Sequence, residues 1–353
     1  MTALTPIHAE LDRITSIHAC LRPFRAAGPR IETERLGEKT VVHNYGHGGS
    51  GWSVSWGSSA MALQMVQATG VRELAVIGCG ALGLTSAVLA QRAGLSVRIY
   101  AKALPPRVHS MHASGLWTPD SRISDAAHAL EFGERWEAMV RTSYATYQAL
   151  LDLPGKPVSW IDSYSLSHRP FVAHPAFAAD EPAYAEFADR VGDLTFPSVT
   201  LDADSHPFAH RHVRRERTLM FNIGTYTNLL MSEFLGAGGK IIVREFDTPG
   251  DLLMLPERTL IHATGYGARA LFGDRAVIPV RGQTARLIPQ PEITYGLRTD
   301  TLSVVPRSDG LLVQALGHGG DFGNDNIAPN RAETEAAVRQ LAAIVDGMRK
   351  VKR

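Results

Sequence analysis

The sequence is poor in cysteine, in net charge and in long apolar runs, and each shortage excludes a class of protein. Cys20 and Cys79 are its only cysteines and lie in unrelated contexts, which argues against a disulfide framework and predicts a reducing compartment. A formal net charge of +1 gives no reason to expect nucleic acid or an anionic membrane as a partner. No apolar run reaches the ~18 residues of a spanning helix, and the N-terminus lacks the apolar core of a signal peptide. A cytoplasmic protein that does not bind a membrane is therefore expected.

Metal-ligand patterns are also missing. His206, His210 and His212 lack a helical H-x-x-x-H spacing, and no cysteine or carboxylate cluster accompanies them, so no metal site is expected. With the arginines at 211, 214, 215 and 217 they are expected to form a solvated basic face. If the substrate carries a second acidic group, this segment is the first place to look for its partner.

The densest glycine cluster of the chain lies at residues 43–57, which read His-Asn-Tyr-Gly-His-Gly-Gly-Ser-Gly-Trp-Ser-Val-Ser-Trp-Gly. Four glycines in the six positions 46–51 let the backbone adopt positive φ and approach a flat ligand closely. The next run, residues 58–68, is expected to be a helix ended by Gly70. A bare loop before a helix N-terminus offers unpaired N–H groups to a phosphate or another electron-rich oxygen, although an ordinary surface turn can have the same composition.

A second glycine motif follows an apolar run. Residues 73–77 are followed by G-x-G-x-x-G at 78–83, an Ala/Leu-rich run to Arg92 and a second apolar run at 96–100. This strand, turn, helix and strand pattern predicts a dinucleotide-binding unit, in which the glycines allow a tight turn and close approach of the pyrophosphate. The motif does not separate FAD from NAD(P). Lys102 stands where an acidic residue would hold the ribose hydroxyls, which keeps an NADPH-dependent reductase open.

These motifs together resemble the D-amino-acid oxidase family of FAD-dependent oxidoreductases. The glycine stretch 43–57 is similar to the family signature, and Arg22-Pro23 is similar to the family's substrate-anchoring Arg-Pro. Further similarity lies in Gly115-Leu116-Trp117-Thr118-Pro119, in Ala-Thr-Gly at 263–265 and in Arg281-Gly282-Gln283. The resemblance covers most of the chain except residues 153–220. It implies an α/β fold with a Rossmann-like FAD-binding domain and a discontinuous, mixed-sheet substrate domain.

The order of the motifs differs from that of the family. In the family the glycine signature lies near the C-terminus, whereas here it precedes the nucleotide-binding motif, so the chain resembles a circular permutation that moves this C-terminal segment to the N-terminus. At 353 residues the chain is long enough for two domains. We expect an FAD-binding domain from 36–150 and 231–270, a substrate domain from 1–35, 151–230 and 271–330, and a C-terminal helix within 331–353.

The resemblance implies which residues hold the cofactor. They belong to the two glycine motifs, to the segment beside the flavin's ribityl chain and ring, and to the ends of the second and later strands. They are Gly48, Gly49, Gly51, Trp52, Ser53, Gly78, Cys79, Gly80, Ala81, Leu82, Gly83, Lys102, Ser110, Gly115, Leu116, Trp117, Phe246, Thr264 and Gly265.

The resemblance also implies a substrate site built from Arg22, Gly49, Ser50, Thr118 and Ser303. The planar guanidinium of Arg22 would form a fork onto the substrate carboxylate, and the Gly49 carbonyl would accept a hydrogen bond from the amine. Ser303 stands where the family has a tyrosine that contacts the carboxylate, and the lid tyrosine of the family falls near Thr299, with Tyr295 a few residues away. Because a serine is too short for the same contact, a larger or differently placed substrate is expected.

The implied activity is an FAD-dependent oxidase that breaks a C–N bond of an amino acid or related amine. The hydride would pass to flavin N5, the imine would hydrolyse in water, and O2 would reoxidise the flavin to give H2O2. No catalytic side chain is expected, because the cofactor supplies the electron sink. The alternatives are an oxidase or dehydrogenase of a secondary amine or specialised biosynthetic intermediate, an NADPH-dependent reductase, and a non-catalytic flavin-binding protein. The oligomeric state stays open, a homodimer included.

Overall fold

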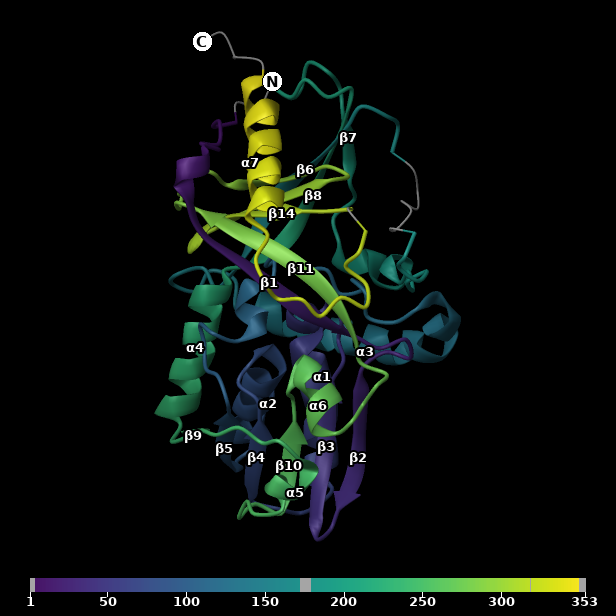
Figure 1. Cartoon of the computed structure of the whole chain (residues 1–353), viewed down its shortest axis with the longest axis vertical. Coiled ribbons are helices and arrows are strands. Elements are labelled where there is room, and N and C mark those ends of the chain that lie inside the picture. The colour runs from purple at the N-terminus through teal and green to yellow at the C-terminus, as the bar shows by residue number, and fades with distance from the viewer. Residues whose placement is uncertain (1–3, 172–178, 318, 349–353) are drawn as a thin grey trace.

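The computed structural model describes residues 4–171, 179–317 and 319–348 and contains two sheets arranged one above the other (Figure 1). The lower sheet has the strand order β2-β3-β10-β4-β5-β9. Its strands are β2 (Arg30–Leu36), β3 (Lys39–Tyr45), β10 (Thr259–His262), β4 (Glu73–Ile77), β5 (Ser96–Ala101) and β9 (Lys240–Val243). All neighbours pair in parallel except β2 and β3, which form an antiparallel hairpin at one edge.

The upper sheet has the order β1-β11-β14-β13-β12-β6-β8-β7 and mixes antiparallel pairs with one parallel pair, β12 with β6. Its strands are β1 (Ile14–Phe24), β11 (Ile278–Leu287), β14 (Gly310–Ala315), β13 (Leu302–Arg307), β12 (Tyr295–Arg298), β6 (Val158–Ser167), β8 (His212–Phe221) and β7 (Val199–Leu201). β1 and β11 pair along almost their whole length and cross the middle of the molecule (Figure 1). The predicted α/β class with mixed sheets is confirmed.

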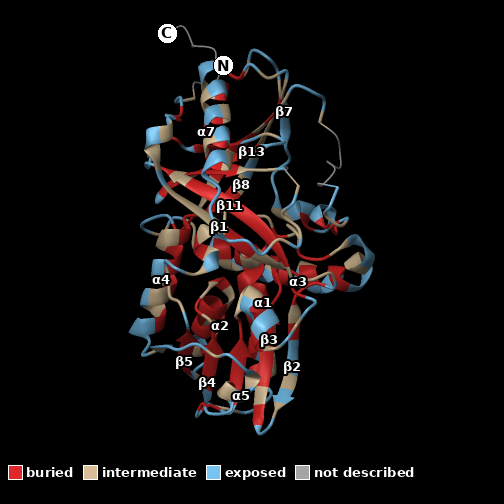
Figure 2. Cartoon of the chain, viewed as in Figure 1, coloured by how far each residue is buried: buried red, intermediate tan, exposed pale blue. Residues whose placement is uncertain are grey.

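The helices divide between the two sheets. In chain order they are α1 (Gly51–Gln67), α2 (Ala81–Arg92), α3 (Ala129–Gln148), α4 (Ile223–Gly236), α5 (Pro249–Leu252), α6 (Ala268–Leu271) and α7 (Arg331–Asp346). Single 3-10 turns lie at Leu11–Arg13, His109–His112, Ala126–His128, Ala188–Leu194 and Gly265–Gly267. α1 and α2 pack on the lower sheet with α3 and α4 outside them, and α7 covers the upper sheet. Figure 2 shows the buried residues concentrated on α1, α2 and the strands beside them.

The first helix starts earlier than the sequence pattern predicts. It begins at Gly51 rather than near Ser58, because residues 52–59 are buried on every side and therefore show no 3.6-residue apolar period. A side chain at Gly57 would overlap the backbone of Met139, so glycine is required where α1 crosses α3. The helix ends at Gln67, and Gly70 adopts a φ of 70° just beyond it, as expected.

Three elements relate the two sheets to the predicted domain ranges. β2 lies in the lower sheet although it falls mostly inside the predicted substrate range 1–35, because its hairpin with β3 ties it to that sheet. α4 likewise begins inside the predicted substrate range 151–230 but packs against α2. α7 covers the upper sheet and shares a core with β13 and β14 rather than standing apart.

None of the described helices is both long and apolar enough to cross a membrane.

Candidate functional site

The turn between β4 and α2 has the close packing that the G-x-G-x-x-G spacing predicts. Gly78 has a φ of 115°, and a Cβ there would lie 2.5 Å from the Ala263 carbonyl oxygen at the end of β10. A Cβ at Gly83 would overlap the Gly78 carbonyl oxygen, so the first turn of α2 lies directly on the strand. The Ala81 N–H donates to Ser110 Oγ at 3.2 Å, which brings the segment around Ser110 to this turn.

The glycine loop after β3 leads directly into α1. Gly46 and Gly48 have φ of 90° and 53°. The Gly48 N–H donates to the Pro23 carbonyl at 2.8 Å, so the loop lies beside the end of β1. In the part of the chain that the structure describes, the N–H groups of residues 51–53 have no acceptor, as the first turn of a helix requires. A helix of 17 residues adds a partial positive charge at this end, and an electron-rich oxygen fits there.

The polar residues of the same signature form a buried network beneath the loop. His47 Nε2 lies 2.7 Å from Ser58 Oγ, and that hydroxyl donates to Asn44 Oδ1 at 2.6 Å. Asn44 Nδ2 in turn donates to Ser86 Oγ on α2 at 3.2 Å. Burial, together with the smaller effect of the positive charge of Arg135, lowers the pKa of His47 to about 3, so the ring is neutral near pH 7. Asn44 and His47 therefore tie β3 and the loop after it to α1 and α2.

Residues 110–113 join the two sheets. Four consecutive carbonyl oxygens accept hydrogen bonds from four different side chains. The donors are Trp52 Nε1 to Ser110, Arg286 Nη2 to Met111, Thr284 Oγ1 to His112 and Arg307 Nη1 to Ala113. Trp52 lies on α1, whereas the other three donors lie on β11 and β13. This segment, which the sequence places beside a flavin, is held from both sides.

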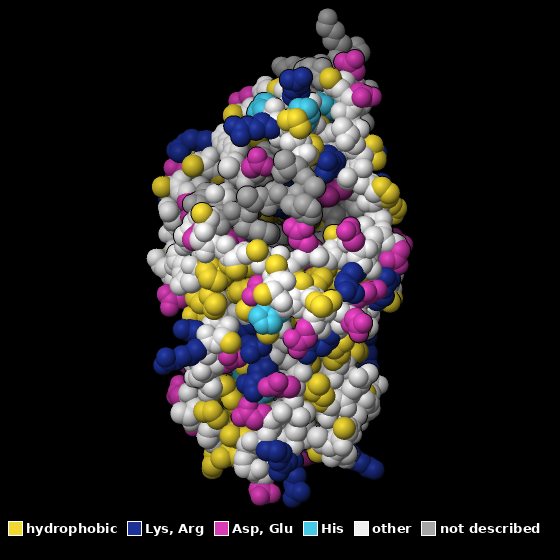
Figure 3. All heavy atoms as spheres, turned by 90° about the vertical axis from the view of Figure 1, so that its right-hand side faces the viewer, with side chains coloured by type: hydrophobic (Ala, Val, Ile, Leu, Met, Phe, Trp, Pro, Cys, Tyr) yellow, Lys and Arg dark blue, Asp and Glu magenta, His cyan; other side chains and the backbone are white. Residues whose placement is uncertain are grey.

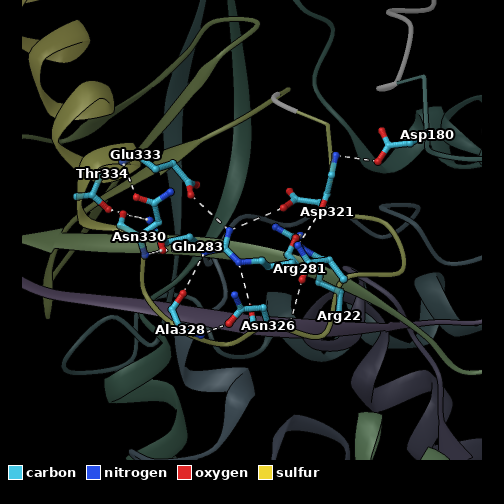
Figure 4. Close-up of polar contacts among 12 residues, drawn as sticks. Arg22, Asp180, Arg281, Gln283, Asp321, Asn326, Ala328, Asn330, Glu333 and Thr334 are labelled. Carbon is cyan, nitrogen blue, oxygen red and sulfur yellow. Dashed lines mark hydrogen bonds and ion pairs between the residues drawn. The ribbon is translucent and has the colours of Figure 1, made fainter.

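Arg22 lies on the face of β1 that is turned toward the lower half of the molecule. Its Nη1 donates to the Arg281 carbonyl at 2.6 Å, and a Cβ at Gly282 would overlap its guanidinium, so the side chain lies flat over that glycine (Figure 4). Among residues 4–171, 179–317 and 319–348, no carboxylate lies within 4.0 Å of this guanidinium. Burial lowers the pKa of Arg22 and the positive charge of Arg122 adds to this, whereas Cys20 and the more distant carboxylates of Asp321 and Glu181 raise it.

Arg281 lies on the opposite face of β11 and is surrounded by acceptors. Its guanidinium donates to the carbonyl of Asn326 at 3.1 Å and to Gln283 Oε1 at 3.0 Å, and it lies 3.4 Å from Glu333 (Figure 4). Gln283 continues the network to Asn330. A polar cavity of about 580 Å³ lies between Arg281 and this loop.

A loop that the sequence did not single out closes over the glycines. The Ser121 carbonyl accepts from the Gly49 N–H at 2.9 Å and from Ser50 Oγ at 3.0 Å. A Cβ at Gly48 would overlap the carbonyl oxygen of Arg122, whose φ is 51°. The Arg122 guanidinium makes a bidentate pair with Glu181 at 2.9 Å for both contacts. No local pattern marks these residues, because their positions depend on contacts between residues 59 and 71 positions apart in the sequence.

The structure places the other predicted cofactor residues around the same region. Thr118 N–H donates to Ser53 Oγ at 2.8 Å, and Trp117 is buried next to it. Thr264 Oγ1 lies 2.6 Å from His262 Nε2 at the end of β10, and Gly265 has a φ of 58°. The remaining predicted residues of this group lie in the turns already described or beside them: Cys79, Gly80, Leu82, Gly115 and Leu116.

Lys102 does not stand alone at the end of β5. Its Nζ lies 3.0 Å from Glu245, which follows β9 on the neighbouring strand, and both side chains are exposed. Phe246 packs edge-to-face on Tyr100 at 6.1 Å between ring centroids. A carboxylate therefore lies beside Lys102 at the end of β5, on a segment that only the sheet order brings there.

Ser303 lies on β13 and is 5% exposed, paired across the sheet with Gln314 and Arg298. Tyr295, considered as a lid residue near Thr299, is buried in the core instead, and its hydroxyl donates to the Thr5 carbonyl at 2.7 Å. The described residues hold no group of three His, Cys, Asp or Glu placed to bind a metal ion.

The fold and the turns fit a dinucleotide cofactor, and comparisons with known proteins agree. A family model described as FAD dependent oxidoreductase matches residues 73–353. The D-amino-acid oxidase of Streptomyces coelicolor is 28% identical over 280 residues, which cover 77% of each chain. The D-amino-acid oxidase of Dictyostelium discoideum is 24% identical over 278 residues, 77% of this chain and 72% of that protein.

Solved structures with a similar fold include the glycine oxidase of Geobacillus kaustophilus, with a TM-score of 0.52 and 13% identity over 80% of this chain and 81% of that one. The glycine oxidase of Bacillus cereus has the same TM-score, with 15% identity over 80% of this chain and 83% of that chain. At these identities the likeness concerns the fold alone.

Proposed function

The chain belongs to the family of FAD dependent oxidoreductases, and from this premise we propose that it oxidises a C–N bond of an amino acid or related amine. It is an enzyme, and its cofactor is FAD. Bound FAD supplies the acceptor for the hydride, so the chain's own residues have to bind and orient the substrate and exclude competing reactions. The two glycine turns and the open N–H groups at the start of α1 are suited to hold that cofactor.

The observation that carries the proposal is the unpaired guanidinium of Arg22. Arg122 is paired with Glu181 and Arg307 with Asp309, whereas Arg22 has one backbone carbonyl and no carboxylate within 4.0 Å in the described part of the chain. A partly buried arginine costs free energy unless an anion accompanies it. A carboxylate on the substrate would complete this site with two parallel hydrogen bonds.

The glycine loop would orient the rest of the substrate. Gly48 is bonded to Pro23, the residue after Arg22, so the loop and the carboxylate anchor are held close together. The Gly49 carbonyl would accept a hydrogen bond from the amine, with Ser50 and Thr118 beside it. The open N–H groups of residues 51–53 and the dipole of α1 would stabilise negative charge that develops on the cofactor.

We assign no side chain the role of a catalytic base. Cys20 lies two residues before Arg22 on β1 and therefore on the same face of the sheet. It is buried, and burial raises the pKa of its thiol. His47 is neutral and bonded to Ser58. The imine product would hydrolyse in water, and O2 would accept the electrons to give H2O2. A cytoplasmic location and a homodimer remain predictions from the sequence.

Ser303 supports a second candidate, an oxidase or dehydrogenase of a secondary amine or specialised intermediate. A small hydroxyl on β13 leaves room where a tyrosine would restrict the substrate. The NADPH-dependent alternative rested on Lys102 alone, and the Lys102–Glu245 pair removes that support because a carboxylate lies beside the lysine.

The circular permutation is part of the proposal. The N-terminal residues Ile7 and Ala9 share a core with Leu341 and Ile344 of α7, so the two ends of the described chain lie together (Figure 1). The connection from α1 to β4, residues 68–72, is short and mostly exposed. A chain recut in this connection, with its present ends joined, should fold and bind FAD. A recut chain that does not bind FAD would argue against this part of the proposal.

The test of the activity is anaerobic mixing of the FAD-loaded enzyme with D-amino acids, glycine and N-substituted amino acids. Loss of the visible flavin absorption with one class identifies the substrate. A holoenzyme that keeps its oxidised spectrum with every member of the panel would contradict the proposed activity.

A further inference from the structure

One face of the upper sheet carries a row of polar side chains across five neighbouring strands. Gln314 on β14 pairs with Ser303 on β13, and Ser303 pairs with Arg298 on β12. Arg298 pairs with Ser165 on β6, and Ser165 pairs with Arg214 on β8. Residues directly opposite each other project to the same side of a sheet with Cβ atoms about 5 Å apart. We call these five residues the polar row.

The polar row lies on the same face as Arg22. Arg22 on β1 pairs with Val280 on β11, so the two side chains project to the same face. Every second residue of β11 projects to that face as well, which includes Arg286, and Arg286 pairs with Leu312 on β14. Leu312 is two residues from Gln314 and therefore shares its face. Two hydrogen bonds support this assignment of faces. Thr284 and Arg307, both on this face, donate to the neighbouring carbonyls of residues 112 and 113.

The two arginines of the row are not neutralised. In the described ranges neither Arg298 nor Arg214 has a carboxylate within 4.0 Å, and Arg214 stacks on the Phe171 ring with 4.5 Å to its centroid. Burial raises the pKa of nearby Glu216, and the positive charges of Arg298 and Arg214 oppose that shift. Two guanidinium groups against one carboxyl group leave a positive charge of at least one on this face.

The neighbouring arginines on the other face behave differently. Arg217 lies 3.1 Å from Asp162, and Arg215 lies 4.0 Å from the same carboxylate. Figure 3 shows acidic and basic side chains interspersed over the side of the molecule where β7 lies, so a general positive field does not explain the unpaired arginines of the row. Within the basic segment 211–217, the strand register places Arg214 on the face of the sheet that also carries Arg22.

We propose that the polar row is a second substrate subsite, which takes an acidic group at the far end of a molecule whose amino-acid carboxylate is held by Arg22. This proposal rests on the proposed function. Arg22 on β1 and Arg298 on β12 are four strand spacings apart, about 19 Å. The Arg22 guanidinium already lies over Gly282 on the next strand, β11, and the reach of the Arg298 side chain reduces the gap further, whereas Arg214 lies two strands beyond Arg298. The substrate is therefore an elongated diacid, and Ser303 and Gln314 offer a hydroxyl and an amide to its middle.

The polarity of this middle section is unusual for buried positions. Ser303 is 5% and Gln314 8% exposed, and among the described residues neither side chain makes a hydrogen bond to protein, although neither polar atom is fully enclosed and both can be reached by a ligand. Buried polar groups normally have a partner. A substrate with polar atoms along its length would supply those partners, whereas a short aliphatic amino acid would leave them unused.

The test is a titration of the FAD-loaded enzyme with α,ω-dicarboxylates from succinate to tetradecanedioate, each matched with the monocarboxylate of equal length, and read by the change in flavin absorption. We expect the longer dicarboxylates to bind roughly tenfold more tightly than their matched monocarboxylates, with the advantage shrinking as salt is added. Arg298→Gln and Arg214→Gln should each remove most of that advantage while leaving monocarboxylate binding unchanged. Arg217→Gln on the opposite face is the control and should keep the advantage.

The possible outcomes separate the subsite from the function it rests on. If monocarboxylates bind but dicarboxylates of every length bind no better, the polar row is a solvated surface and the inference is overturned. The same holds if Arg217→Gln and Arg298→Gln weaken dicarboxylates equally. If neither series perturbs the flavin spectrum of the wild-type holoenzyme, the carboxylate site at Arg22 is itself contradicted. The unperturbed flavin spectrum of each variant shows that it is folded.

Discussion

The two faces of the β1–β11 ribbon carry neighbouring arginines with opposite surroundings. On one face Arg281 is surrounded by backbone carbonyls, Gln283 and Glu333, so every direction of its guanidinium has an acceptor. On the other face Arg22 lies over Gly282 with one carbonyl as its partner. The comparison teaches that residue type and burial do not identify a binding residue. A binding residue is identified instead by the absence of protein acceptors around its charged group.

The largest expected effect comes from removing the unsatisfied arginine. Arg22→Ala should lower kcat/KM for the preferred amino acid roughly a thousandfold, about 4 kcal/mol of transition-state stabilisation, mainly through KM. The free energy of unfolding should change by less than about 1 kcal/mol, because one carbonyl hydrogen bond is lost along with a desolvated charge. Steady-state kinetics and urea unfolding measure the two quantities. Unchanged kinetics would remove Arg22 from the site.

The opposite arginine should show the reverse pattern. Arg281→Gln should lower the free energy of unfolding by about 3 kcal/mol, because Glu333 and several carbonyls lose a charged donor in a buried setting. The KM of the correctly folded fraction should change much less than in Arg22→Ala. Urea unfolding of the holoenzyme checks this expectation. An Arg281→Gln variant that is as stable as wild type but has a much higher KM would contradict the structural role of Arg281.

A smaller change tests how Arg22 is positioned. Gly282→Ala places a methyl group where the Arg22 guanidinium lies, and the flexible end of that side chain has to move. We expect KM to rise roughly tenfold, about 1.4 kcal/mol, with little change in stability. The variant Gly320→Ala, at a glycine with no atom within 4 Å of its Cβ but a φ of 73°, is a control for strain outside the site. Equal effects of both substitutions on KM would contradict this role for Gly282.

The smallest effect concerns pH and the network beneath the loop that holds Arg22. His47 has a pKa of about 3 in the folded protein, below its ordinary 6.5, because it is buried. The unfolded chain therefore binds a proton near pH 6.5 that the folded chain does not bind until about pH 3. Stability should fall as pH decreases from 6.5, at up to about 1.4 kcal/mol per unit for this residue. His47→Asn should reduce that slope by one proton, as urea unfolding at pH 5 to 7 can show.

A His47→Asn slope equal to that of wild type would mean that other buried histidines account for the pH dependence. The half-buried His112 is one more such group, since burial and the positive charges of His18 and Arg286 together lower its pKa to about 4.

The parts of the site that the sequence predicted are those made by local motifs. The turn at 78–83, the glycine loop and Arg22 each depend on a few consecutive residues, so spacing and residue type predict them. The contacts of Ser121, Arg122 and Glu181 could not be predicted, because they depend on which distant loops meet. The same reason hides the polar row, whose members come together through the register of strands far apart in the sequence.

The fold shows the same division. The βαβ pattern at 73–100 predicts β4, α2 and β5, whereas the start of α1 was misplaced because a helix buried on all sides has no amphipathic period. The sheet to which β2 belongs could not be predicted for a similar reason, since its partner strand and not its composition determines it.

The most direct test of the account is a crystal structure of the FAD-loaded enzyme with a bound carboxylate such as benzoate or the substrate itself. We expect the carboxylate within hydrogen-bond distance of the Arg22 guanidinium, beside the Gly48–Gly49 loop and against the cofactor. A carboxylate bound elsewhere, or Arg22 paired with an acidic side chain of the protein in the presence of FAD, would contradict it.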